Sequence, residues 1–145
     1  MKNNRFNGHG TYTYKEGKNQ KTYIGKFLDG GKTGWGTMTY KNGDKAEAEF
    51  KNGKCNGTGK CWKYNGDLYE GGFKDNFYNG KGKLTYKAGG YYNGDWKEGF
   101  ATGNGEKKFQ STDFYKGEFV KGKPDGYGTC EYKNGNKYAG QWKAN

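Results

Sequence analysis

The chain has very few of the residues on which most enzymes and most globular cores depend. It has one Pro, one His and three Cys among 145 residues, and only 30% of it is apolar. The single His and the single Ser are His9 and Ser111, too few to assemble a nucleophile, a base and an orienting group. No stretch approaches the roughly 18 apolar residues of a membrane-spanning helix. We therefore expect neither an enzyme nor a transmembrane protein.

The cysteines also exclude several kinds of site. Cys55, Cys61 and Cys130 form no even disulfide framework, and the first residues carry no apolar secretory leader, so we expect an intracellular, reducing compartment. The gap from Cys55 to Cys61 lacks the close spacing and the second ligand pair of a zinc site. Acidic residues fall singly, which disfavours calcium and acid–base chemistry. We predict no metal and no cofactor.

What the chain does contain is glycine and aromatic rings. There are 29 Gly, and 19% of the residues are Phe, Trp or Tyr. Glycine disfavours helices, whereas Tyr, Phe, Trp and Thr favour strands. The composition predicts an all-β protein whose buried surface is mostly aromatic.

A 23-residue repeat organises these residues into columns. One column starts each unit with Tyr23, Ala46, Tyr69, Tyr92, Tyr115 and Tyr138, and four residues later an aromatic follows, as Phe27, Phe50, Phe73, Trp96, Phe119 and Trp142. A pair of glycines spaced by one residue recurs in every unit, from Gly8/Gly10 and Gly34/Gly36 onward. The repeat predicts one supersecondary unit stacked on the next.

Each unit reads as a β-hairpin. In the segment from Tyr40 to Asp44, a type I turn followed by a left-handed Gly43 predicts a three-residue loop with a bulge. Bulky side chains on such a sheet need bare backbone to lie against, so we expect the glycine pair to lie under the rings. We predict a single 1–145 domain, an elongated antiparallel sheet of about six stacked hairpins. The hairpins are expected near residues 8–27, 34–50, 57–73, 80–96, 103–119 and 126–142.

The columns Tyr-x-Gly-x-Trp/Phe-x-x-Gly-x-x-x-Gly-x-Gly, as in residues 115–128, closely resemble the MORN repeat, the membrane occupation and recognition nexus. The resemblance covers nearly the whole chain. It implies an elongated, twisted antiparallel sheet that mediates protein contacts or dimerisation, in junctional-membrane, ciliary or cytoskeletal settings, with phospholipid binding in some members. Ala46, Ala48, Lys63 and Lys107 depart from the aromatic and apolar columns, and we expect local soft spots there. The alternative for Lys63 and Lys107 is that they meet an acidic residue of a partner in the groove.

Three surfaces are candidates for binding a partner. The first is an aromatic, Gly-floored groove in which part of each ring is expected to stay open, because only one sheet exists. It comprises Tyr23, Phe27, Tyr40, Phe50, Tyr69, Phe73, Tyr86, Tyr92, Trp96, Phe109, Tyr115, Phe119, Tyr132, Tyr138 and Trp142. The alternative for these rings is that they only pack on each other.

The second candidate is a loop patch of Phe77, Tyr78 and Phe100, which is either a contact site or a plug between repeats. The third is a basic rim at the hairpin turns and just past the aromatic column. The rim comprises Lys15, Lys41, Lys51, Lys74, Lys87, Lys97, Lys133 and Lys143. Solvated Lys is also typical of turns, where it opposes aggregation of the sheet.

These surfaces predict a non-catalytic scaffold that binds a peptide or helix along the groove. The alternative is peripheral attachment to anionic phospholipid through the basic rim, which the net charge of +11 permits. Nucleic acid fits less well, because Glu and Asp interrupt the positive field. Unpaired sheet edges also allow a homodimer. We expect an intracellular location, in the cytoplasm or at the cytoskeleton or a membrane; the sequence does not identify the partner.

Overall fold

A computed structural model describes residues 5–17 and 19–144 and shows an all-β chain. The described residues form twelve strands in one sheet. The strands are β1 (Gly8–Thr13), β2 (Gln20–Leu28), β3 (Gly31–Tyr40), β4 (Lys45–Lys51), β5 (Lys54–Trp62), β6 (Leu68–Lys74), β7 (Phe77–Thr85), β8 (Tyr91–Lys97), β9 (Phe100–Lys108), β10 (Phe114–Val120), β11 (Lys123–Glu131) and β12 (Lys137–Trp142). The all-β prediction and the single antiparallel sheet are confirmed.

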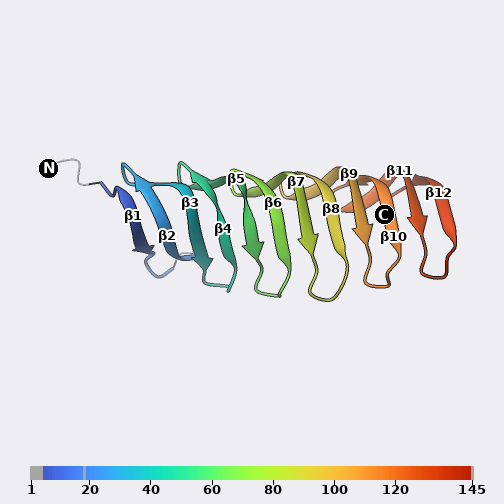
Figure 1. The fold of residues 1–145 in the computed structure, drawn as a ribbon, viewed down its shortest axis with the longest axis horizontal. Helices are drawn as coiled ribbons and strands as arrows, with labels where there is room; N and C mark the ends of the chain where they lie inside the picture. The colour runs from blue at the N-terminus through green and yellow to red at the C-terminus, as the bar shows by residue number, and fades with distance from the viewer. Residues whose placement is uncertain (1–4, 18, 145) are drawn as a thin grey trace.

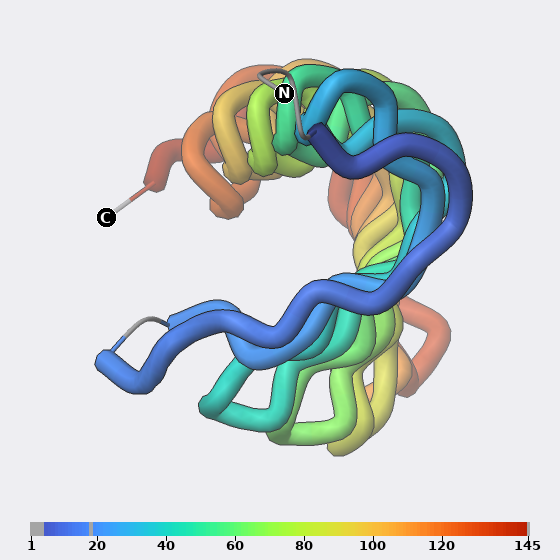
Figure 2. The backbone as a smooth tube through the Cα atoms, turned by 90° about the vertical axis from the view of Figure 1, so that its left-hand side faces the viewer, coloured from blue at the N-terminus to red at the C-terminus, as the bar shows by residue number. Residues whose placement is uncertain are grey.

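The strands follow one another across the sheet in chain order, each antiparallel to the next. Figure 1 shows the resulting row, with β1 at one end and β12 at the other. Viewed along the row, the backbone of each repeat is bent into an open C, so the sheet forms a trough rather than a flat surface (Figure 2). A single sheet can bury side chains only on the face around which it curls, and this face carries the aromatic columns.

The predicted three-residue loops close one long edge of the trough. The N–H of Gly43 donates to the carbonyl of Tyr40 at 3.0 Å, and Tyr40 N–H donates to the carbonyl of Asp44 at 2.9 Å. Gly43 has φ of 100°, the left-handed conformation that completes this bulged turn. Thr112 takes the same place with φ of 76°, which is costly for a β-branched residue.

The other long edge is closed by two-residue turns, which sequence reasoning missed. Asn52 and Gly53 have φ of 52° and 81°, the pattern of a type I′ turn. Asn-Gly between two strands is a strong signal for this turn, so the information was present in the sequence. The same turn occurs at residues 29–30, 75–76, 98–99 and 121–122.

A bulge next to each two-residue turn bends the sheet into the trough. In β4 and β5, Ala48 pairs with Gly59 and Phe50 pairs with Cys55, so Glu49 alone faces residues 56–58. Gly57, the first glycine of its pair, lies in this bulge with φ of 116°. The Glu49 carboxylate accepts hydrogen bonds from the N–H and the hydroxyl of Thr58 at 3.1 and 2.9 Å. These two hydrogen bonds lower the pKa of Glu49 below its ordinary value.

In four of the six pairs the second glycine lies under a tyrosine ring, as predicted. The exceptions are Gly10, which faces Phe27, and Gly59, which faces Ala48. A Cβ built on Gly82 would stand 2.2 Å from the hydroxyl oxygen of Tyr69, too close for any side chain. The Tyr69 hydroxyl donates to the carbonyl of Gly72 at 2.7 Å, which satisfies it although the ring is fully buried. Tyr23, Tyr92, Tyr115 and Tyr138 repeat this bond to the residue three positions on.

Candidate functional site

The aromatic ladder, defined as the tyrosine column and the aromatic column four residues later, is mostly closed to solvent. Tyr69 is 0% exposed and Trp96 is 7% exposed. Successive rings meet edge to face, with Tyr92 and Trp96 centroids 5.2 Å apart, and these contacts leave little of the rings exposed to solvent. The expectation that part of every ring stays open is therefore wrong for most of the ladder. The buried members are Tyr23, Phe27, Phe50, Tyr69, Phe73, Tyr92, Trp96, Tyr115 and Phe119.

The open rings of the predicted groove lie instead beside the three-residue loops. We define this loop column as Tyr40, Tyr86, Phe109 and Tyr132. The first three are half-buried, and Tyr132 is 36% exposed. Trp142 is also half-buried, and Tyr138 is exposed on the last strand. The accessible part of the groove is thus narrower than the sequence predicted and follows one edge of the trough.

The ladder is broken where Ala46 takes the place of a tyrosine. On one side, Tyr23 contacts Phe50 with centroids 5.0 Å apart. On the other, Tyr69 contacts Phe73 at 5.3 Å, and the ring contacts continue from there to the last strand. Among the described residues, no ring contact joins the first set to the second. Ala46 therefore interrupts the row of ring contacts, while the buried core continues across the interruption through Ala48, Cys55 and Cys61.

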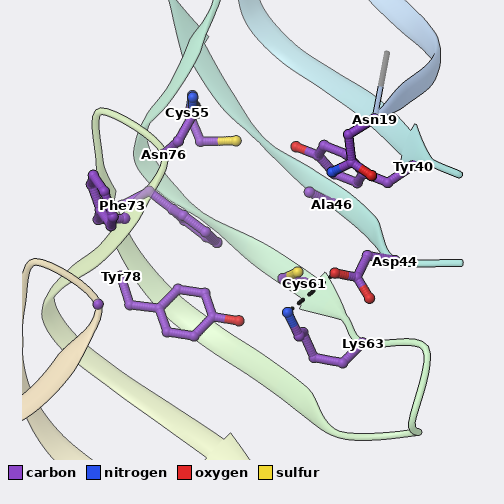
Figure 3. A pocket seen from close by; sticks show the side chains of 12 residues that line it. Asn19, Tyr40, Asp44, Ala46, Cys55, Cys61, Lys63, Phe73, Asn76 and Tyr78 are labelled. Carbon is purple, nitrogen blue, oxygen red and sulfur yellow. Dashed lines mark hydrogen bonds and ion pairs between the residues drawn. The ribbon is translucent and has the colours of Figure 1, made fainter. Parts of the chain in front are cut away.

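A cavity of about 270 Å³ lies at this break. Its lining includes Tyr40, Ala46, Phe73 and Tyr78, from strands that belong to three consecutive hairpins. Figure 3 shows Phe73 and Tyr78 on one side, Tyr40 and Ala46 on the other, and the two sulfur atoms between them. Sequence reasoning marked Ala46 and Lys63 as departures from the columns but did not recognise that they border one cavity.

The two charged side chains that line the cavity form an ion pair with each other. Lys63 Nζ lies 3.1 Å from Asp44 Oδ2, drawn as the dashed line in Figure 3. Burial works to raise the pKa of Asp44, but bonds from the Tyr64 N–H and from Lys63 outweigh it, and the pKa is lowered. Burial raises the pKa of the Cys55 thiol to about 12, and that of Cys61 is also raised. Both thiols are therefore protonated at neutral pH and are poor nucleophiles and metal ligands.

The loop patch separates into two parts. Phe77 is 55% exposed and Phe100 is 50% exposed at the two-residue turns. Tyr78 lies on the opposite face, half-buried, with its ring stacked on Tyr69 at a centroid distance of 3.7 Å. Tyr78 is thus the plug between repeats, whereas Phe77 and Phe100 remain candidates for contact.

The basic rim is exposed along its whole length. Lys15, Lys41, Lys87 and Lys133 lie at the three-residue loops, and Lys51, Lys74, Lys97 and Lys143 lie at the opposite ends of the strands or just beyond them. The ion pairs of the described residues use other lysines, such as Lys60 and Lys81. The rim therefore forms two separate rows, one at the three-residue loops and one at the opposite ends of the strands.

Lys107 is held by rings rather than by a carboxylate. Its Nζ lies 5.0 Å from the centroid of Phe109 and 5.9 Å from that of Tyr86. Burial lowers the pKa of Lys107, and the two aromatic faces offset part of that desolvation. The expectation of a local soft spot at Lys107 stays a prediction.

The described residues contain no group of three or more His, Cys, Asp and Glu side chains able to hold a metal ion. His9 lies exposed in β1, and Ser111 lies exposed in the loop between β9 and β10, where its hydroxyl accepts from the N–H of Asp113 at 3.4 Å. Within the described residues, no helix is long and apolar enough to cross a membrane.

Comparison with known proteins identifies one family. The family model of the MORN repeat matches residues 1–18, 23–45, 47–68, 69–91, 92–113 and 115–137, which is most of the chain. A search of curated proteins finds no match. The six matched segments follow the 23-residue period, and five of them begin within a residue of the tyrosine column.

Proposed function

Since the chain belongs to the MORN repeat family, we propose that it is a non-catalytic scaffold that binds a protein segment along the trough. MORN repeats are interaction modules, and the ligand proposed for this one is a peptide or an amphipathic helix. An intracellular location, in the cytoplasm or at the cytoskeleton or a membrane, is part of the same proposal. No cofactor or metal is required for it.

The observation that supports this proposal is the row of open rings beside the three-residue loops. The cavities that the loop column borders include one of about 270 Å³ beside Tyr40 and one of about 170 Å³ between Phe109 and Tyr132. Cavities of this size beside half-buried rings accept side chains rather than whole molecules. Successive hairpins are two strand spacings apart, about 9.6 Å, so a segment lying along the trough meets a ring of the loop column at each hairpin except the one that carries Lys63.

Mutations of the loop column test this proposal without disturbing the core. Tyr132→Ala and Phe109→Ala are expected to lose the partners that the native chain captures from a cell extract. Tyr127→Ala is the matched control, because Tyr127 belongs to the same repeat and is 54% exposed on the other face. Tyr92→Ala and Trp96→Ala are unsuitable, because both rings are buried and their loss unfolds the protein before it tests binding. Retention of all partners by well-folded loop-column variants contradicts the proposal.

The exposed basic rim favours a second candidate, peripheral binding to an anionic membrane. Each Lys close to such a surface contributes about 1 kcal/mol. Sedimentation with acidic vesicles separates the two functions, because membrane binding is sensitive to salt and is lost in the Lys41→Gln/Lys87→Gln/Lys133→Gln variant. Protein capture along the loop column is expected to survive these substitutions. Nucleic acid stays a weaker possibility, since Glu and Asp alternate with Lys on the sheet, as in the Lys60–Glu70 pair.

A homodimer through the sheet edges is a further part of this proposal. β1 and β12 are the two edge strands of the described sheet. An edge strand presents unpaired N–H and C=O groups that a second copy can pair with. Sedimentation equilibrium over a range of concentrations measures this association directly.

A further inference from the structure

We propose that the segment bound in the trough is acidic and that its carboxylates pair with Lys32 and Lys107, an inference that rests on the scaffold function proposed above. Each of these lysines stands in a column that is uncharged in the other repeats of the 23-residue period. The column of Lys32 continues as Cys55, Tyr78, Ala101 and Pro124, and the column of Lys107 also holds Met38, Cys61, Leu84 and Cys130. The two lysines therefore place positive charge where the trough is otherwise lined by uncharged side chains.

Both side chains lie on the concave face of the sheet. Lys107 pairs across the strands with Tyr92 and Tyr115, which are buried members of the aromatic ladder, so it shares their face. Lys32 Nζ lies 5.8 Å from the ring centroid of Tyr23, another buried ladder residue. Both lysines are half-buried, so a segment lying in the trough can reach them.

Neither ammonium forms an ion pair with a carboxylate of the described residues. Lys32 Nζ instead donates to the hydroxyl of Tyr14 at 2.7 Å, and Lys107 Nζ lies over the rings of Tyr86 and Phe109. Burial lowers the pKa of Lys107, because its ammonium loses water without gaining a negative charge in return. A carboxylate on a bound segment supplies that charge.

Of the two lysines that the sequence marked for an acidic partner, Lys63 already has a carboxylate within the chain. Its Nζ lies 3.1 Å from Oδ2 of Asp44, the residue that closes the preceding three-residue loop. The equivalent loop position is Lys21 or Gly90 in the two loops whose tyrosines contact the unpaired lysines. The carboxylate that pairs with Lys63 thus has no counterpart at those loops, and both ammonium groups stay open to a partner.

The position of these lysines favours a protein segment over other anionic partners. A bilayer is a broad surface that meets the edges of the open C in Figure 2 rather than the concave face between them. Single-stranded nucleic acid needs open ring faces for its bases to stack on, and the rings beside Lys107 already have an ammonium over them. An acidic segment needs neither, since its apolar side chains pack on the loop column while its carboxylates reach the lysines.

The distance between the two lysines sets the length of such a segment. Lys32 lies in β3 and Lys107 in β9, which are six strand spacings or about 29 Å apart along the row. A helix of roughly 20 residues spans this distance. A shorter segment is expected to meet only one of the two lysines.

A displayed library of random peptides about 24 residues long tests the inference on the full chain. Peptides selected on the native chain are expected to be enriched in Asp and Glu over the starting library. Replacing these residues of a selected peptide by Asn and Gln is expected to weaken binding at least about tenfold. Selected peptides without an excess of acidic residues overturn the proposal and leave the scaffold function standing.

The variant Lys32→Ala/Lys107→Leu separates the trough lysines from the general positive charge of the chain. It introduces residues that Ala101 and Leu84 already place in the same columns, so the fold is expected to hold. The selected acidic peptides are expected to bind this variant at least about tenfold more weakly, whereas their Asn and Gln versions are expected to bind it within about twofold of the native chain. If the double variant does not fold, either single substitution decides, with an expected loss of at least about threefold.

The matched control is Lys41→Gln/Lys87→Gln, which removes the same charge from exposed positions of the three-residue loops. It is expected to weaken binding of the acidic peptides by less than about threefold. An equal loss in the control and in the trough variant shows attraction to the net charge alone and overturns the proposal.

Two further outcomes of the same experiments contradict the acidic segment in different ways. A single-stranded oligonucleotide that binds the native chain and not the Lys32→Ala/Lys107→Leu variant assigns the two lysines to nucleic acid instead. A library from which no peptide can be selected contradicts the scaffold function itself, and the acidic segment with it.

Discussion

The two glycines of each pair differ in what they do for the strand. Gly57 belongs to the bulge and needs a left-handed φ of 116°, whereas Gly82 is bare so that Tyr69 can lie on it. The first glycine of each pair thus meets a constraint on the backbone, and the second glycine, except Gly10, meets a constraint on the space above it. A side chain at either position disturbs a different part of the trough.

The close approach of the Tyr69 ring to Gly82 predicts that substitution by alanine destabilises the protein much more at Gly82 than at Gly10, although both glycines belong to the same column. Gly82→Ala is expected to lower the free energy of unfolding by about 2–3 kcal/mol, because the new methyl overlaps the Tyr69 ring. Gly10→Ala is the matched control, since a Cβ there meets only Phe27 at 3.8 Å. The Gly10→Ala substitution is expected to change the free energy of unfolding by less than about 0.5 kcal/mol. Urea unfolding followed by tryptophan fluorescence measures both, and equal effects would show that ring contact is not the reason for the glycine.

At the scale of the hairpin, the three-residue loops are joined to one another by carboxylates. Asp44 Oδ1 accepts a hydrogen bond from the backbone N–H of Tyr64 in the next loop at 2.8 Å. In the same way, Asp67 Oδ1 accepts from the backbone N–H of Lys87 at 3.0 Å. Asp113 does the same to Lys133 at 2.7 Å. Gly90 stands in this column and has no carboxylate to offer. Each bond ties a hairpin to the following one outside the strand pairing.

These bonds predict a pH-dependent contribution from Asp44. Its pKa is lowered in the folded chain, so the stabilisation is complete above the unfolded pKa of about 3.9 and is lost as the pH falls through the lower folded value. Asp44→Asn is expected to cost about 1–2 kcal/mol at pH 7, and this difference should shrink below about pH 4. Urea unfolding over a pH series measures it, with Glu16→Gln in the exposed first loop as the control. A difference that stays constant down to low pH would exclude the carboxylate as its origin.

For the molecule as a whole, the break at Ala46 matters more than either end of the strand row. Two connected sets of rings lie on either side of it. The first comprises Phe6, Tyr12, Tyr14, Tyr23, Phe27 and Phe50, and the second comprises Tyr69, Phe73, Tyr78, Tyr92, Trp96, Tyr115, Phe119, Tyr138 and Trp142. A repeat protein is stabilised by its repeat-to-repeat contacts, so a weak contact lets one part open before the other. That residues 1–145 form a single domain stays a prediction, and this break is where it is most easily tested.

Native-state hydrogen exchange should reveal the break. Amides of β3 and β4 are expected to exchange at a lower opening free energy than those of β8 and β9, although all four strands are interior to the sheet. Ala46→Phe is expected to reduce this difference in opening free energy between the two pairs of strands by about 0.5–1.5 kcal/mol for each ring contact that it restores. Ala88→Phe should leave the pattern unchanged. Uniform protection across the four strands in the native chain would show that the two ring sets act as one.

The sequence by itself determined the repeat, the hairpin and the face of each strand, because those depend on local chemistry. The three-residue loop ending in Gly43 follows from its own residues, and alternate positions along a strand must lie on opposite faces. The glycine under Tyr69 was predictable for the same reason, since ring and glycine recur at fixed spacing. The family followed from these columns.

Only the tertiary structure decided which rings are open. A flat sheet would leave one side of Tyr92 in water, but the bulges curl the sheet and bring Phe119 of the next repeat over that side. Curvature depends on pairing between strands, as at Glu49 opposite residues 56–58, and no single segment encodes it. The cavity beside Ala46 has the same origin, because its lining comes from three hairpins that meet only when the sheet has formed.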